Sequence, residues 1–160
     1  MVSQVEYTDN FYTMKKGFTM IELLIVIGVT IIVLTAALPI YSNLQISAQL
    51  NETSSQIAQT IRSARGRASS GYNNSAHGVK FLENSYVIYE GPNYALRTTE
   101  NDREIPLDSP ISISTDLTDD EIYFSKRLGV PSESGTITIT HDVDGTRTVS
   151  ISAIGIVDEN

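Results

Sequence analysis

The longest apolar run in the chain lies close to its N-terminus. Residues 18–38 read FTMIELLIVIGVTIIVLTAAL, and Glu22 is the only charged residue among these 21. About 20 apolar residues are enough for a helix to cross the hydrocarbon core of a bilayer. Lys15 and Lys16 precede the run and no cation follows it before Arg62, so the positive-inside rule orients the N-terminus towards the cytoplasm. The pattern predicts a cytoplasmic segment at 1–17, a transmembrane helix at 18–40 and an extracytoplasmic remainder.

A cleaved secretory signal is the alternative interpretation of this run. Such a signal has a shorter apolar stretch, followed by small residues at a cleavage site. Thr35-Ala36-Ala37 supplies only a weak site of that kind.

Beyond Pro39 the apolar positions keep a helical spacing. Five residues form one stripe, with polar residues on the remaining faces: Leu50, Ile57, Ile61, Ala64 and Ala68. The spacing predicts an amphipathic helix at 41–68 whose apolar stripe lies against a sheet. Pro39 lacks a backbone donor, so we expect it to kink or locally melt the long helix.

After Gly71 the apolar period changes to two, which is typical of strands. The pattern predicts a β-rich head at 69–160, with strands at 78–82, 85–90, 94–97, 111–114, 121–125, 136–141, 147–151 and 154–157. Glu83-Asn84 and the four residues 142–145, which end in Asp-Gly, are typical of hairpin turns. The expected fold class is α+β: a long N-terminal helix packed on a small antiparallel sheet.

Charge and composition exclude several classes of protein. The chain has 160 residues, a net charge of −8 and no cysteine, which excludes disulfides, thiolate metal sites and a cysteine nucleophile. Residues 69–160 hold six Lys and Arg against fifteen Asp and Glu, or −9. A surface of this sign disfavours general binding to nucleic acids.

Glu22 is unusual because a carboxylate within an apolar helix costs several kcal/mol unless it is neutralised or paired. Either it lies shallow enough for its side chain to reach the lipid headgroups, or another molecule supplies a cation. The segment Lys15-Lys16-Gly17-Phe18-Thr19-Met20-Ile21-Glu22 resembles the processing site of type IV pilins and pseudopilins. The resemblance implies cleavage by a prepilin peptidase between Gly17 and Phe18 and N-methylation of Phe18. It also implies that Glu22 pairs with the amino terminus of a neighbouring subunit during assembly.

Within that class, the head resembles type II secretion minor pseudopilin H and the FimT-type minor pilins. The residues that carry this resemblance are Gly78-Val79-Lys80-Phe81, Ile122-Tyr123-Phe124, Gly129-Val130-Pro131, Val149-Ser150-Ile151 and Gly155. The chain lacks the cysteine pair that closes a C-terminal loop in many major pilins.

No constellation of side chains predicts catalysis. His77 and His141 fall at predicted strand or loop edges, where we expect solvated histidines, and no Gly-x-Ser-x-Gly elbow is present. Asp142 and Asp144 are weak candidates for a calcium site, as is the acidic group at 116–121, but neither matches an EF-hand loop. We expect no enzyme activity, no cofactor and no other metal site.

Arg62, Arg65 and Arg67 follow one another on the amphipathic helix. FimT-type minor pilins can bind DNA through basic residues, so a DNA contact is one interpretation. The acidic head would repel a phosphate backbone, which favours contacts with neighbouring subunits or lipid headgroups instead.

These observations favour a structural, minor subunit of a type IV pilus or type II secretion pseudopilus, anchored in the inner membrane. The partners implied by the resemblance are other pilin subunits, a prepilin peptidase and an assembly platform with its own ATPase. The alternatives are a DNA-uptake (competence) minor pilin and, less favoured, a membrane-anchored ectodomain with hydrolytic or metal-dependent activity.

Overall fold

The computed structural model describes residues 17–160, apart from the side chains of 36–41. The chain divides into two compact units, Met1–Ile40 and Tyr41–Asn160. A single helix, α1 (Met20–Ser70), runs through both of them.

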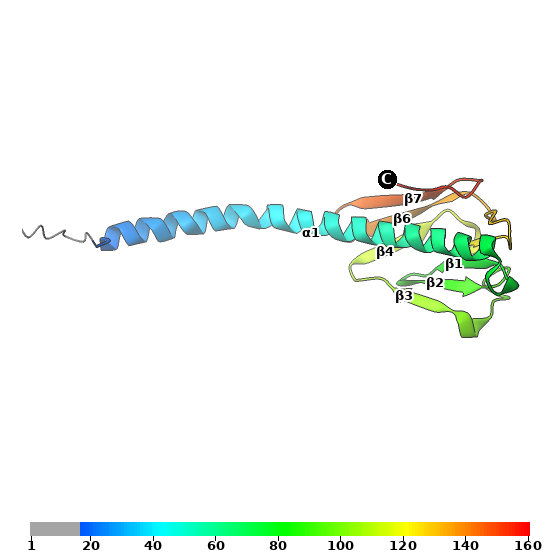
Figure 1. Ribbon diagram of the computed structural model, residues 1–160. Coiled ribbons are helices and arrows are strands. Elements are labelled where there is room, and N and C mark those ends of the chain that lie inside the picture. The colour runs from blue at the N-terminus through cyan, green and yellow to red at the C-terminus, as the bar shows by residue number, and fades with distance from the viewer. Residues whose placement is uncertain (1–16) are drawn as a thin grey trace, which may run out of the picture. The chain divides into compact units, whose positions relative to one another are not determined.

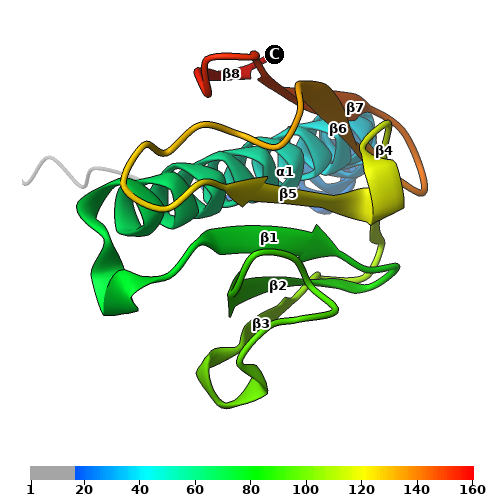
Figure 2. The same cartoon turned by 90° about the vertical axis from the view of Figure 1, so that its right-hand side faces the viewer.

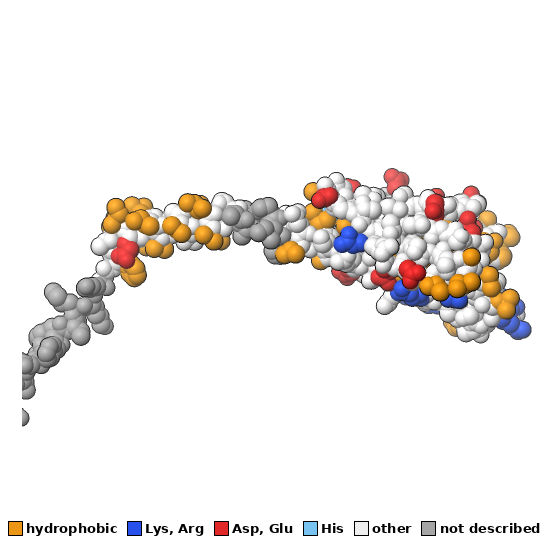
Figure 3. Space-filling view, turned by 90° about the horizontal axis from the view of Figure 1, so that it is seen from above, with side chains coloured by type: hydrophobic (Ala, Val, Ile, Leu, Met, Phe, Trp, Pro, Cys, Tyr) orange, Lys and Arg blue, Asp and Glu red, His pale blue; other side chains and the backbone are white. Residues whose placement is uncertain are grey.

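In the first unit, the described part of α1 exposes its apolar side chains on every side. Between Met20 and Leu34 the large apolar residues are roughly half to four-fifths exposed, and Figure 3 shows them along this stretch. Thr30 and Thr35 turn their hydroxyl groups inward and donate to backbone carbonyl groups of the preceding turn. Within the residues whose side chains are described, no helix is long and apolar enough to cross a membrane.

In the second unit, the C-terminal half of α1 supplies one face of the core. The apolar stripe expected from the sequence is fully buried: Leu50, Ile57, Ile61, Ala64 and Ala68. Ala58, which the prediction did not include, is buried beside it. The helix continues two residues past the predicted end at 68 and stops before Gly71. Gly71 has φ of 70° and donates its N–H to the Ala68 carbonyl, which ends the helix in the left-handed conformation that glycine tolerates.

The first sheet has four antiparallel strands in the order β3-β2-β1-β5. They are β1 (His77–Phe81), β2 (Ser85–Glu90), β3 (Arg103–Pro106) and β5 (Glu121–Phe124). The second sheet has the order β4-β6-β7-β8 and is also antiparallel. Its strands are β4 (Ile111–Thr115), β6 (Gly135–His141), β7 (Thr146–Ile151) and β8 (Val157–Glu159). Short 3-10 helices occur at Tyr72–Asn74, Thr99–Asn101 and Thr118–Asp120.

Both sheets pack on the same helix. Viewed towards the C-terminal end of α1, β1, β2 and β3 lie on one side of it, and β6, β7 and β8 on the other (Figure 2). Both sheets contribute apolar side chains to the core, among them Phe81, Tyr86 and Phe124 from the first, and Ile137, Ile139 and Val149 from the second. Within this unit the C-terminal half of α1 is therefore the shared centre of the fold (Figure 1). The α+β prediction is confirmed.

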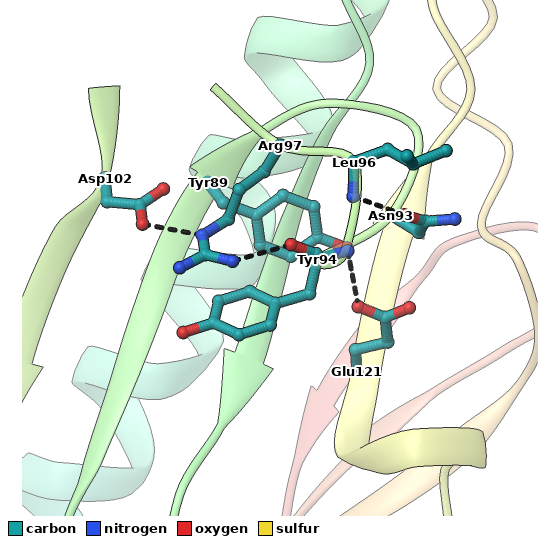
Figure 4. Close-up of polar contacts among 7 residues, drawn as sticks. All are labelled: Tyr89, Asn93, Tyr94, Leu96, Arg97, Asp102 and Glu121. Atoms are coloured by element: carbon teal, nitrogen blue, oxygen red, sulfur yellow. Dashed lines mark hydrogen bonds and ion pairs between the residues drawn. The ribbon is translucent and has the colours of Figure 1, made fainter. Parts of the chain in front are cut away.

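One predicted strand is wrong. Residues 94–97 form turns, and the edge strand of the first sheet is β3 at Arg103–Pro106. The cause is a set of side-chain contacts within the loop (Figure 4). The backbone N–H of Tyr94 donates to Glu121 Oε2 at 2.8 Å, and the Arg97 guanidinium lies 3.7 Å from the Tyr94 ring centroid.

The last predicted strand is displaced along the chain. Residues 154–157 were expected to be extended, but the backbone turns at Ser152–Ile156 and β8 begins at Val157. Gly155 has φ of 79° within this turn, and its N–H donates to the Ser152 carbonyl. The N–H of Ile156 donates to the Ser152 hydroxyl, which closes the turn. The remaining strands occur within two residues of their expected bounds.

Candidate processing and assembly site

The residues before α1 form the first part of the candidate site. Gly17, Phe18 and Thr19 are not helical and all three are exposed. Thr19 caps the helix, because its Oγ1 accepts the N–H of Glu22 at 3.2 Å and its carbonyl accepts the N–H of Leu23 at 3.1 Å. The Gly17–Phe18 peptide bond therefore lies immediately outside a capped helix. Lys15 and Lys16 lie outside the described residues.

Glu22 occupies the third position of α1, three residues after its cap. A Thr followed three residues later by Glu is the sequence of a capping box, and the negative charge complements the positive end of the helix dipole. The Glu22 side chain is exposed among exposed apolar neighbours such as Ile21 and Leu23. It is therefore open to a cation supplied from outside the chain.

Pro39 falls within the range of α1, but its side chain lies outside the described residues. The kink expected there stays a prediction.

Arg65 and Arg62 are engaged within the molecule. Arg65 donates to three backbone carbonyls on two loops, those of Gly129, Ile154 and Gly155, at 2.8–3.2 Å. Arg62 pairs with Glu159 Oε1 at 2.9 Å and donates to the Val157 carbonyl at 2.8 Å. Glu159 also accepts from the Ser55 hydroxyl at 2.8 Å. These two arginines hold the C-terminal strand and its preceding loop against α1.

Arg67 faces a different side of the helix from the other two. Its guanidinium lies 5.9 Å from the Tyr72 ring centroid, and no carboxylate lies within ion-pair distance of it in the part of the chain that the structure describes. Of the three arginines that the sequence singled out for DNA or a neighbouring subunit, Arg67 alone keeps an uncommitted charge among the described contacts.

Both histidines are buried, so the expectation of solvated histidines is wrong. His77 is 2 % exposed and its Nε2 lies 3.2 Å from the Tyr72 carbonyl. His141 is 6 % exposed and its Nδ1 accepts the N–H of Val143 at 3.2 Å. Each ring thus makes a hydrogen bond that fixes a neighbouring turn. The sequence did not reveal this role, because a histidine at the end of a strand can be either buried or exposed and the local pattern does not distinguish the two.

The acidic residues at 116–121 serve mainly as internal acceptors. Asp116 Oδ1 accepts the N–H of Thr136 at 2.5 Å, and Asp120 Oδ1 accepts from the Thr115 hydroxyl at 2.7 Å. Across the residues with described side chains, no three acidic or histidine side chains are grouped to hold a metal ion. The structure therefore brings no third ligand of that kind to the calcium candidates Asp142 and Asp144.

Glu121 links the loop after β2 to β5. Its Oε2 accepts both the Tyr94 N–H and, at 3.2 Å, the Tyr89 hydroxyl. Burial, together with the nearby Glu121 carboxylate, raises the pKa of Tyr89 well above its usual value. Arg97 donates to Asp102 Oδ2 at 2.7 Å, a hydrogen bond that raises the pKa of the guanidinium (Figure 4). These contacts order the loop between β2 and β3.

Comparisons with known proteins agree with this geometry. Residues 13–38 match the family model of the prokaryotic N-terminal methylation motif. The fold is similar to that of the type IV minor pilin FimU of Pseudomonas aeruginosa, with a TM-score of 0.56 and 16% identity over 69% of this chain and 92% of that one. It is also similar to the minor pseudopilin EpsH of the Vibrio cholerae type 2 secretion system, with a TM-score of 0.55 and 10% identity over 70% and 96%. No curated protein matches the chain by sequence.

The chain thus combines a match to the N-terminal methylation motif with a fold similar to that of a minor pilin and a minor pseudopilin. Its globular unit has the fold that the minor pilin FimU and the minor pseudopilin EpsH share.

Proposed function

We propose that the chain is a minor structural subunit of a type IV pilus or of a type II secretion pseudopilus. The observation that carries the proposal is the placement of the methylation motif. The Gly17–Phe18 bond lies exposed directly before a capped helix whose apolar N-terminal part, up to Leu38, carries Glu22 as its only charged residue. In the proposed function the leader at 1–17 is removed by a prepilin peptidase and Phe18 is N-methylated. The apolar helix then enters the core of a helical filament, while the globular unit faces outwards.

The precursor is proposed to reside in the inner membrane with a single pass at 18–40. Lys15 and Lys16 keep the leader in the cytoplasm, and the globular unit lies on the other side. Other pilin or pseudopilin subunits surround it in the filament, and an inner-membrane platform with a separate ATPase drives assembly. The proposal assigns no catalysis and no cofactor to the chain.

Glu22 is the proposed assembly residue. Removing a carboxylate from water is costly unless a cation neutralises it, and the methylated amino terminus of a neighbouring subunit is such a cation. Pairing the two groups would favour one register between adjacent helices over its alternatives. An exposed Glu22 side chain at the start of α1 is compatible with this role.

The test is the intact mass and the N-terminal sequence of the full-length chain, extracted from membranes with and without a prepilin peptidase. A peptidase-dependent start at Phe18, heavier by one methyl group, supports the proposal. A start near Ala37 or Leu38 points to a secreted domain, and an unprocessed Met1 in both samples contradicts the filament role.

A matched pair of variants separates processing from assembly. Glu22→Gln keeps the size of the side chain but removes its charge, so we expect normal cleavage and failure to enter sheared filaments. Glu52→Gln, an exposed carboxylate on the same helix, serves as the control and should assemble normally. Equal incorporation of both variants would exclude the assembly role of Glu22.

A further inference from the structure

Two loops of the globular unit are joined by one side chain near the C-terminal end of α1. The first loop connects β5 to β6, and the second connects β7 to β8. The Arg65 Nε donates to the Gly129 carbonyl of the first loop at 3.2 Å, and its Nη1 donates to the Gly155 carbonyl of the second at 2.8 Å. Because both carbonyl oxygens bind the same planar guanidinium, the two loops form one continuous surface.

The residues on either side of these two glycines are aliphatic and exposed. Their exposed fractions lie between 48% and 76%, and we call the four together the loop patch: Leu128, Val130, Ile154 and Ile156. Single exposed apolar residues are common on protein surfaces and need no explanation. A group of them on one surface is uncommon, and it marks a site of interaction.

Hydrogen bonds within each loop fix the loop patch before any partner binds. In the first loop, the N–H of Ser125 donates to the Val130 carbonyl at 2.8 Å, and the N–H of Gly129 donates to the Ser125 carbonyl at 2.8 Å. In the second, the N–H of Ser152 donates to the Ile156 carbonyl at 2.9 Å. An ordered surface loses little conformational entropy on binding, which favours its use as a contact.

Lys126 and Arg127 give the loop patch a basic edge. Both side chains are exposed, and neither forms an ion pair with another described residue. They are the only charged residues at 125–131, and 152–156 carry no charge, whereas residues 69–160 as a whole carry −9. Aliphatic side chains beside these cations favour a partner surface that combines aliphatic side chains with carboxylates.

The loop patch lies at one end of the globular unit. The chain enters this unit along α1 at Tyr41, and the first loop packs on the last turn of the helix, where the N–H of Arg127 donates to the Ala68 carbonyl at 2.7 Å. Apolar and basic side chains are visible at the end of the unit where α1 stops (Figure 3). The patch is therefore at the opposite end of the unit from the entry of the helix.

We propose that the loop patch docks on a different pilin-type subunit, whose contact surface carries aliphatic side chains beside carboxylates. This contact rests on the proposed function, because a minor subunit is surrounded in its filament by subunits of other sequences. The four aliphatic side chains lose their water at the centre of the contact. Lys126 and Arg127 form ion pairs at its edge, where charge selects the partner.

A protein surface suits the loop patch better than a lipid surface does. Proteins that bind at the membrane interface use tryptophan and tyrosine rings at the level of the headgroups. Neither residue type occurs at 125–134 or at 152–156.

Photocross-linking of the full-length chain, in the cells that naturally make it, tests the contact. Benzoylphenylalanine replaces Leu128 in one variant and Ile154 in a second, so that each loop is probed separately. The control carries it at Val143, which is 76% exposed, as Leu128 is, but lies on the turn between β6 and β7. Mass spectrometry then identifies the cross-linked chain and the peptide that is joined. We expect both loop positions to join one and the same chain, which differs from this one, carries its own methylation motif and has carboxylates in the joined segment. The control position should give no adduct with that chain.

Charge reversal tests the basic edge. Combining Lys126→Glu with Arg127→Glu in the Leu128 probe should reduce the adduct by about tenfold. Arg103→Glu, which reverses an exposed cation on β3, is the matched control and should leave the adduct unchanged.

Four results would overturn the contact. They are an adduct at the loop positions no stronger than at Val143, different chains joined at Leu128 and Ile154, a joined chain without the methylation motif, and adducts with lipid or with a second copy of this chain.

The N-terminal start of the same membrane-extracted protein is read in parallel. A start at Phe18 without the adduct removes the contact and leaves the proposed function. The expected adduct on a chain that keeps Met1 supports the contact and removes the proposed function.

Discussion

Arg65 is the most highly connected side chain on the polar face of α1. A guanidinium can donate to several acceptors in a fixed fork, and here all three acceptors are backbone carbonyls. Arg62 has a more exposed ion pair and one carbonyl contact. The three nearby arginines therefore form a graded series in which Arg67 makes the fewest contacts with the rest of the chain.

Substitution of each arginine by Ala should reproduce that series. We expect Arg65→Ala to lower the free energy of unfolding by about 2–3 kcal/mol, because a buried carbonyl loses a charged donor. Arg62→Ala should lower it by about 1 kcal/mol and Arg67→Ala by less than ~0.5 kcal/mol. Urea denaturation of the full-length chain in detergent, followed by the near-ultraviolet signal of its tyrosines, measures all three. Equal decreases in the free energy of unfolding for Arg65→Ala and Arg67→Ala would contradict this ranking of the arginines by their contacts.

Glu159 gives the globular unit a pH-dependent contact. The Ser55 hydroxyl and then Arg62 hold the pKa of this carboxyl below its ordinary value of 4.5. A carboxyl whose pKa is lower in the folded state stabilises that state above pH 4.5, and the stabilisation is lost as the pH falls through the folded-state pKa. Glu159→Gln should therefore be less stable than the parent chain at pH 7, and the two should be equally stable once the pH is below the folded-state pKa of Glu159. Thermal unfolding of both chains between these pH values measures the difference in stability. A difference that does not change with pH would contradict this role of Glu159.

The sequence did not reveal the partners of these arginines. Their spacing on the helix was visible, but their acceptors lie 64–97 residues further along the chain, and local patterns carry no information on such pairings. The buried histidines illustrate the same limit. His77 and His141 are enclosed by tertiary packing that hydrophobic periodicity does not describe.

Among the elements, the long helix and the hairpins were predictable because their signals are local. A helical stripe and the Asp-Gly turn each depend on residues a few positions apart. The prediction of a strand at 94–97 was wrong because alternating apolar and polar residues form a strand only where a neighbouring strand supplies backbone hydrogen bonds. Here Glu121 takes the Tyr94 N–H, and β3 pairs with β2 in its place.

Gly78 in β1 marks a close approach between neighbouring elements. A Cβ atom there would lie 2.4 Å from the Tyr89 hydroxyl oxygen and 2.7 Å from the Ile122 carbonyl oxygen. Because the second atom is backbone of β5, which pairs with β1, it cannot shift without disturbing that pairing, and we expect Gly78→Ala to destabilise the fold by about 3 kcal/mol.

Gly66 provides the opposite case on α1. A Cβ atom at this position meets nothing within 4 Å, so Gly66→Ala should stabilise the helix by about 0.5–1 kcal/mol. Chemical denaturation of Gly66→Ala and Gly78→Ala measures the change in the free energy of unfolding that each substitution causes. A stabilising Gly78→Ala would show that β1 and β5 are not packed as described.

For the whole molecule, the helix has two different surroundings along its length. Up to Leu34 its described large side chains are exposed, whereas from Leu50 its apolar stripe forms the centre of the globular core. The same helix therefore combines an apolar surface at one end with a folding scaffold at the other.

Removing residues 41–70, the part of α1 that belongs to the globular unit, should prevent folding. We expect residues 41–160 to unfold cooperatively, whereas 71–160 lack the helical stripe that both sheets contact and should give no cooperative transition. Near-ultraviolet circular dichroism and thermal melts of the two fragments compare them directly. A cooperative melt of 71–160 would show that the sheets form a core without the helix.

The hydrogen bonds that Arg62 and Arg65 make with β8 and the loop before it have a consequence for biosynthesis. Because β8 and the loop before it follow every other described strand in the chain, the two arginines leave the ribosome about 90 residues before their acceptors on β8 and that loop. During that interval the helix face towards β8 has no partner of its own. The contacts that hold β8 against α1 therefore form only after β8 itself has been synthesised.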